Sequence, residues 1–169
     1  MSVSGKLYRP NVGIALFNRA GRIFLARRVG DDGPEVVFPG FEWQLPQGGI
    51  DKGENGEAAA RRELAEETGV VSASLLAMLA RQVTYDWPPY DGPPHRLTAW
   101  RGQVQTWFAF RFEGEETEID LARAAPGVPP EFDQWRWEEL SRIPDLVVPY
   151  KQAIYRAIAA EFAPFAHSG

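Results

Sequence analysis

The stretch from Gly48 to Val70 constrains this chain more than any other part of its 169 residues. Its sequence is GGIDKGENGEAAARRELAEETGV. From Asn55 to Thr68 the residue types favour a helix, and a glycine follows as a C-terminal stop. Positions three and four residues apart are neighbours on a helix, so Glu63, Glu66 and Glu67 share one narrow face. The stretch therefore predicts a short helix that carries a ridge of three carboxylates.

Like charges on one helix face repel one another by about 0.2–0.5 kcal/mol for each pair. Arg62 relieves only part of this repulsion by reaching Glu66. A hard divalent cation, magnesium or manganese, would turn the repulsion into coordination. A solvated face with scattered charges is the alternative. However, Gly56 and Ala59 lie one turn earlier on the same arc and leave room for a ligand. We therefore predict an open metal site.

The spacing is Gly48, five residues, Glu54, seven residues, and then Arg-Glu-apolar-x-Glu-Glu-x-Gly-apolar from Arg62 to Val70. It resembles the signature of the Nudix hydrolases without a departure. The resemblance implies the α/β Nudix fold, in which a mixed β-sheet is sandwiched between helices (an α/β/α sandwich). It also implies hydrolysis of a nucleoside diphosphate linked to another moiety, with Mg²⁺, Mn²⁺ or another divalent cation as cofactor.

Segments outside this signature resemble the bacterial RNA pyrophosphohydrolases, a branch also called (di)nucleoside polyphosphate hydrolases. They are residues 8–13 (YRPNVG), 26–28 (ARR), 43–51 (WQLPQGGID), 107–108 (WF) and 130–137 (PEFDQWRW). The branch implies removal of pyrophosphate from 5′-triphosphorylated RNA ends. Tyr85 and Asp86 before Pro88 resemble members that act on dinucleoside polyphosphates, so the alternative is cleavage of diadenosine tetra- or pentaphosphate, or both activities in one enzyme.

The resemblance also assigns roles to residues. Those expected to hold the metal are Gly48, through its backbone carbonyl, Glu54, Glu63, Glu66, Glu67 and Glu118. Those expected in catalysis are Glu63, Glu67, Glu118 and Arg62, which orients the glutamates. Glu118 is chosen by the Glu-Ile-Asp-Leu pattern, and a generic acidic loop is its rival explanation. Candidate substrate contacts are Arg9, Arg27 and Arg28 for phosphate, and Tyr85, Tyr90 and Trp137 for a stacked base.

Two features depart from the branch. Thr106 stands where many relatives have Lys, which removes a cation from the neighbourhood of the phosphates. The segment from Val29 to Glu42, punctuated by Gly and Pro, is longer than usual and is expected to form a loop that reshapes one wall of the site.

Hydrophobic alternation and turn residues predict the remaining elements. Strands are expected at 12–18, 22–28, 103–112 and 131–137, and a helix at 149–162. Residues 74–87 are expected to be strand, although their first half is compatible with a helix, and residues 114–120 form an acidic loop that leads into a strand. Residues 88–101 form a loop long enough to be functional.

Composition limits the function. The formal net charge of −5 argues against broad contact with a nucleic-acid backbone, so duplex DNA is not an expected partner. There is no apolar run long enough to span a membrane, and the absence of cysteine excludes thiol chemistry. A chain with 44% hydrophobic residues is expected to form one domain over residues 1–169. The lack of a membrane span and of cysteine fits a location in the cytoplasm.

Overall fold

The computed structural model describes residues 5–30, 33–122 and 127–167. Its centre is an eight-stranded mixed sheet with the main order β3-β2-β1-β7-β5. The strands are β1 (Tyr8–Phe17), β2 (Ile23–Arg28), β3 (Trp43–Gln44), β4 (Gln47–Gly49), β5 (Ala73–Met78), β6 (Val83–Asp86), β7 (Gly102–Phe112) and β8 (Phe132–Glu138). Strands β1 and β7 run parallel, and the other pairs are antiparallel: β2 and β4 with β1, β5 and β6 with β7, and β3 and β8 with β2.

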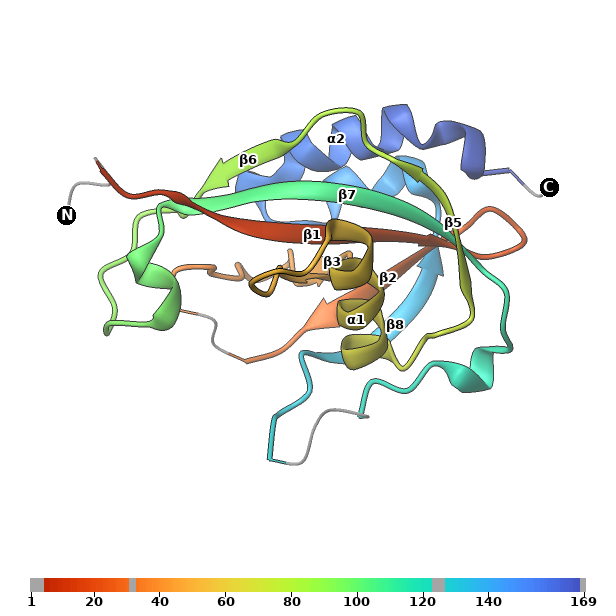
Figure 1. The fold of residues 1–169 in the computed structure, drawn as a ribbon, viewed down its shortest axis with the longest axis horizontal. Helices are drawn as coiled ribbons and strands as arrows, with labels where there is room; N and C mark the ends of the chain where they lie inside the picture. The colour runs from red at the N-terminus through yellow and green to blue at the C-terminus, as the bar shows by residue number, and fades with distance from the viewer. Residues whose placement is uncertain (1–4, 31–32, 123–126, 168–169) are drawn as a thin grey trace.

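Two helices cover opposite faces of this sheet (Figure 1). Alternate residues of β1 point to the two faces, because successive side chains of a strand point in opposite directions. Val12, Ile14 and Leu16 belong to one core cluster, together with buried residues of α1 (Gly56–Thr68). Ala15 and Phe17 belong to the other, together with buried residues of α2 (Gln152–Glu161). The predicted α/β/α sandwich is confirmed.

Helix α1 begins and ends where the sequence predicts. The Asn55 side chain accepts a hydrogen bond from the Ala58 backbone N–H at 2.8 Å, which satisfies one free amide of the first turn. Gly69 ends the helix with a φ of 79°, a conformation that glycine adopts without a steric penalty. Both ends of the acidic helix are therefore fixed by local chemistry.

The predicted strands and C-terminal helix are present, with shifted ends. Residues 74–87 form the two strands β5 and β6, so the helical alternative for their first half is wrong. Residues 114–120 contain a 3₁₀ turn at Glu116–Glu118 instead of a strand. The C-terminal helix starts as a 3₁₀ turn at Pro149–Lys151, and other 3₁₀ turns lie at Arg96–Ala99, Leu140–Asp145 and Ala163–Phe165. Within the described ranges, no helix is long and apolar enough to cross a membrane.

Candidate active site

The Glu63 carboxylate of α1 lies directly against Gly48 of β4. A Cβ at position 48 would be 2.0 Å from the Glu63 Cδ, so only glycine fits without displacing the carboxylate. The Glu63 side chain is 13% exposed. Burial raises its pKa to about 7, although the neighbouring Arg62 opposes the shift. The strand and the helix thus bring a backbone segment and a carboxylate with a raised pKa to the same place.

Arg62 connects the acidic residues. Its Nε and Nη2 donate to the two oxygens of Glu54, both at 2.9 Å, and Nη2 also donates to the Gly49 carbonyl at 2.9 Å. Its Nη1 donates to Glu63 at 3.0 Å and to Glu66 at 3.3 Å. The hydrogen bonds from Arg62 lower the pKa of Glu54 to about 2. Arg62 therefore joins β4 to α1 and pairs with the carboxylates, while Glu66 stays 58% exposed.

Glu67 has a buried carboxylate oxygen, Oε2, that receives no hydrogen bond within the described residues. Burial is the main reason that its pKa lies well above the ordinary value, and the charges of Glu63 and Glu131 add to the shift. A buried carboxylate oxygen without a donor is suited to a bound cation or an ordered water.

The residues present therefore fit a divalent cation. Over the ranges that the structure describes, no three acidic or histidine side chains are already arranged to enclose an ion. The fit therefore rests on Glu63 and Glu67, since magnesium keeps several waters and needs only one or two protein carboxylates together with substrate phosphates.

Two hollows meet at these glutamates. The first, called the acidic cavity here, has a volume of about 160 Å³ and is lined by Arg9, Asn11, Glu35, Gln44, Gln47, Gly48, Gly49, Glu63, Glu67, Arg96, Leu97 and Glu131. The second has about 330 Å³, and its lining includes Glu66 and residues 128–130. Glu63, Glu67 and Glu131 line both, so a polyphosphate that passes these carboxylates has space on either side.

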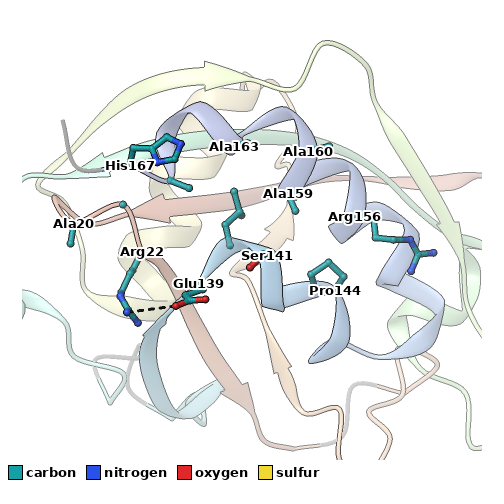
Figure 2. Close-up of a pocket in the computed structure, with 13 residues that line it drawn as sticks. Ala20, Arg22, Glu139, Ser141, Pro144, Arg156, Ala159, Ala160, Ala163 and His167 are labelled. Atoms are coloured by element: carbon teal, nitrogen blue, oxygen red, sulfur yellow. Dashed lines mark ion pairs between the residues drawn. The ribbon is translucent and has the colours of Figure 1, made fainter.

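A larger cavity of about 700 Å³ lies elsewhere (Figure 2). Alanines of α2 and of the segment after it form much of its wall, and Glu139 there pairs with Arg22 at 3.8 Å. It contains none of the glutamates of α1. Its size alone does not make it a candidate for the chemistry.

Glu118 does not lie with the other glutamates, which corrects the expectation from the sequence. Its carboxylate accepts hydrogen bonds from the Val71 amide at 2.7 Å and from the amide and hydroxyl of Ser72 at 2.8 and 2.7 Å. It therefore fixes the chain beyond the end of α1 and lines neither hollow. The acidic residue from outside the helix that lines both hollows is Glu131, just before β8, 3.6 Å from the Arg28 guanidinium. This acidic residue belongs to the segment PEFDQWRW, whereas the Glu-Ile-Asp-Leu pattern indicates Glu118.

Of the three candidate arginines, only Arg9 lines the acidic cavity. Burial and the nearby charge of Arg96 lower its pKa, and it donates to the Gln103 side chain at 3.0 Å. Arg27 instead pairs with Asp133 at 2.9 Å on the surface. Arg28 is 4% exposed and donates to the Glu35 carbonyl at 3.0 Å, so it anchors the 29–42 loop. Arg96, which the sequence did not single out, is the second arginine of the cavity.

The three candidate aromatic residues lie in different parts of the structure. Tyr85 is 6% exposed, and its ring packs against Trp87 and Tyr150, so it is a core residue and has no free face for a base. Trp137 lines neither hollow, and its indole donates to Glu116 at 2.7 Å. Tyr90 lies on another cavity, which is described below.

A buried ion pair forms one wall of the acidic cavity. Glu35, from the 29–42 loop, accepts a hydrogen bond from Lys151 Nζ at 2.6 Å, from the Tyr85 hydroxyl at 2.9 Å and from the Gln47 amide at 2.7 Å. Burial alone would raise the pKa of Glu35, but the charges of Lys151 and Arg28 outweigh it and lower the pKa below the ordinary value. The expectation that this loop shapes a wall agrees with the position of Glu35, while its partner Lys151 was not anticipated.

A cavity lined by several carboxylates and two arginines, next to a Gly-Gly strand, is suited to phosphoric anhydrides. The chain belongs to the Nudix family: the NUDIX domain pattern matches residues 7–159. Members of this family generally need divalent cations.

Known proteins of similar sequence include the RNA pyrophosphohydrolase of Caulobacter vibrioides, with 50% identity over 94% of this chain and 88% of that protein. The RNA pyrophosphohydrolase of Acidiphilium cryptum is 49% identical over 94% of this chain and 92% of that protein. Among solved structures, a MutT protein from Methanosarcina mazei Go1 superimposes with a TM-score of 0.66 over 93% of this chain and 96% of that one. Its sequence identity is 19%, so it supports the fold alone.

Proposed function

We propose that this protein removes pyrophosphate from 5′-triphosphorylated RNA ends in a reaction that depends on Mg²⁺ or Mn²⁺. The observation that carries the proposal is the convergence of Glu63, Glu67 and Glu131 on a cavity that also contains Arg9 and Arg96. The high identity to two proteins named RNA pyrophosphohydrolase, over nearly all of each chain, supports RNA as the substrate. Because cellular RNA is the substrate, we expect the enzyme to act in the cytoplasm.

Glu63 and Glu67, with the Gly48 carbonyl, are the residues that would hold the cation. Glu131 takes the place first assigned to Glu118, and Glu66 is available at the exposed side. When bound, the cation would neutralise phosphate oxygens and lower the pKa of the attacking water.

The protein's own groups supply positioning and proton transfer. Arg9 and Arg96 line the cavity and would bind anionic oxygens of the polyphosphate. Arg62 keeps the carboxylates of α1 in place through its hydrogen bonds. Water attacks a phosphorus atom, the anhydride P–O bond breaks, and pyrophosphate leaves while a carboxylate accepts the water proton. Burial raises the pKa of Glu63 to about 7, which suits a proton acceptor near neutral pH, and burial also raises the pKa of Glu67.

The test is product analysis on four substrates, each with magnesium and with manganese. They are 5′-triphosphorylated RNA, diadenosine tetraphosphate, ADP-ribose and nucleoside triphosphates. We expect release of pyrophosphate and 5′-monophosphorylated RNA, and we expect Glu63→Gln to lower turnover at least about 100-fold, as for loss of an acid–base group. Glu57→Gln, on the same helix but paired with Arg61, is the matched control and should retain activity. Selective hydrolysis of diadenosine tetraphosphate would favour the alternative function, a dinucleoside polyphosphate hydrolase. Inactivity on all four substrates would refute the proposal that the protein is an enzyme of this kind.

A further inference from the structure

A separate cavity of about 540 Å³ is lined mainly by aromatic rings and prolines. We call it the aromatic cavity. Its rings belong to Trp87, Tyr90 and Trp100, and its prolines are residues 34, 88, 89 and 94. The volume lies in the range of small-ligand sites, and flat rings that line a cavity are suited to a flat ligand.

Hydrogen bonds fix two of these rings. The Trp87 indole N–H donates to the carbonyls of Leu97 and Trp100 at 3.1 and 2.9 Å. The Tyr90 hydroxyl donates to the Pro93 carbonyl at 2.6 Å. A ligand that binds against rings already held in place loses little affinity to side-chain ordering.

The polar groups of the cavity are largely engaged within the protein. Asp86 accepts hydrogen bonds from Tyr8 at 2.6 Å and from Arg101 at 2.9 Å. Lys6 donates to the Thr98 carbonyl at 2.7 Å. Stacking, more than hydrogen bonding, is therefore the interaction that the cavity offers.

Neighbouring residues of the same two segments form walls of the aromatic cavity and of the acidic cavity. In one wall, Pro34 lines the aromatic cavity and the next residue, Glu35, lines the acidic cavity. In the other, Arg96 lines the acidic cavity and Thr98 the aromatic one. Both belong to segments at the same end of the sheet, the loop after β6 and the loop before β3 (Figure 1).

The two segments that form these walls also touch each other. A Cβ at Gly33 would be 2.5 Å from the His95 ring, so the loops are in direct contact. The 3₁₀ turn at Arg96–Ala99 separates the two cavities, and one such turn advances only about 6 Å. A ligand whose charged end occupies the acidic cavity is therefore close enough to place a ring in the aromatic cavity.

We propose that the aromatic cavity binds the nucleobase of the nucleoside attached to the polyphosphate, and that Trp100 and Tyr90 are its stacking residues. The proposal rests on the proposed function, because it takes the acidic cavity as the phosphate site. Base–aromatic stacking is tolerant of sequence, so the cavity accepts any of the four bases at the 5′ end.

The test compares Trp100→Ala and Trp100→Phe with the wild-type protein. Trp100 is suitable because no hydrogen bond of its side chain is found in the described structure, so the alanine variant removes only the ring. We measure KM for a 5′-triphosphorylated dinucleotide and the competitive inhibition constant of inorganic tripolyphosphate, which has no base. We expect Trp100→Ala to raise KM about 5- to 150-fold, the range for one stacked base. The inhibition constant of tripolyphosphate should not change, and Trp100→Phe should restore most of the loss.

Tyr90→Ala provides a second variant, and should also raise KM for the dinucleotide alone. Equal weakening of dinucleotide and tripolyphosphate, or no weakening of either, would overturn the proposal. The failure of the proposed function is seen separately, as an absence of turnover by the wild-type protein. In that case tryptophan fluorescence titrations with ATP and with tripolyphosphate give the same comparison, because they need no turnover.

Discussion

Replacing Glu67 by glutamine should stabilise the metal-free protein and inactivate the enzyme. In the native structure, Glu67 Oε2 is shielded from solvent, and no described group donates a hydrogen bond to it. Its pKa is raised well above the ordinary value, first by burial and then by the charge of Glu63. Glutamine has nearly the same shape but no charge, so it removes the repulsion and the cost of burying an ion.

The expected gain is about 1–3 kcal/mol, the cost of one unsatisfied buried polar group, because the glutamine amide can donate to the neighbouring carboxylates where the Glu67 oxygen has no donor. For a chain of this length, 1 kcal/mol corresponds to about 2–4 °C, so the melting temperature should rise by about 2–12 °C. The gain depends on pH. Because the folded-state pKa of Glu67 lies above its unfolded value, the wild-type protein loses stability as pH rises from the unfolded value through the folded one. The advantage of the variant should therefore grow over the same interval.

Thermal melts of wild-type protein, Glu67→Gln and the control Glu57→Gln, in chelator and at several pH values, measure this effect. Glu57 lies on the same helix with a 45% exposed side chain, so its replacement should change stability by less than about 0.5 kcal/mol. Adding magnesium should stabilise the wild-type protein more than Glu67→Gln. The reasoning is refuted if Glu67→Gln melts at or below the wild-type temperature in chelator above pH 7, or if it gains as much as wild type from magnesium.

Three further predictions concern the surroundings of Glu67. Lys151→Met should destabilise the protein by about 3–5 kcal/mol in urea unfolding, because it leaves the Glu35 carboxylate buried without its cation. Adding Glu35→Gln to this variant should recover most of the lost stability. If the two substitutions instead change the unfolding free energy additively, the pairing is contradicted. Gly48→Ala should lower turnover by about two orders of magnitude in steady-state assays with little change in circular dichroism, since a Cβ there displaces the Glu63 carboxylate; unchanged turnover would exclude this contact. Magnesium affinity measured by calorimetry should rise at least about tenfold per pH unit up to about pH 7, where burial places the pKa of Glu63, because the cation binds the ionised carboxylate and Glu67, whose pKa is also raised, adds to the rise; a flat profile would argue against both glutamates as ligands.

The parts of the fold that the sequence predicted are those encoded locally. Helix α1 has its cap at Asn55 and its stop at Gly69, and the carboxylate ridge follows from positions three and four residues apart. The Glu35–Lys151 pair joins residues 116 positions apart, so no local pattern indicates it. Burial of Tyr85 likewise depends on what the folded chain packs around it.

The prediction for Glu118 is wrong for the same reason, because local sequence does not show which groups a side chain meets in the folded protein. An acidic residue outside the helix can be recognised by its sequence neighbours, but its function depends on which group its carboxylate meets. Glu118 accepts hydrogen bonds from the backbone amides of Val71 and Ser72 and acts as a structural acceptor. Glu131 instead faces the carboxylates of α1 across two hollows. The environments of Glu118 and Glu131 therefore depend on the three-dimensional path of the chain, which the local sequence does not reveal.

Glu35 and Glu67 line the same cavity, but only Glu35 has a full set of partners within the described part of the protein. Glu35 has Lys151, Tyr85 and Gln47 as partners, and its charge holds a loop against the sheet. Glu67 lines the same cavity and leaves one shielded oxygen without a donor. Since Glu35 shows that this fold can satisfy a buried carboxylate completely, the unsatisfied state of Glu67 does not result from any lack of donors in the region. We therefore expect the Glu67 oxygen to meet a ligand that is not part of the polypeptide, and the charge of the surrounding carboxylates favours a cation there.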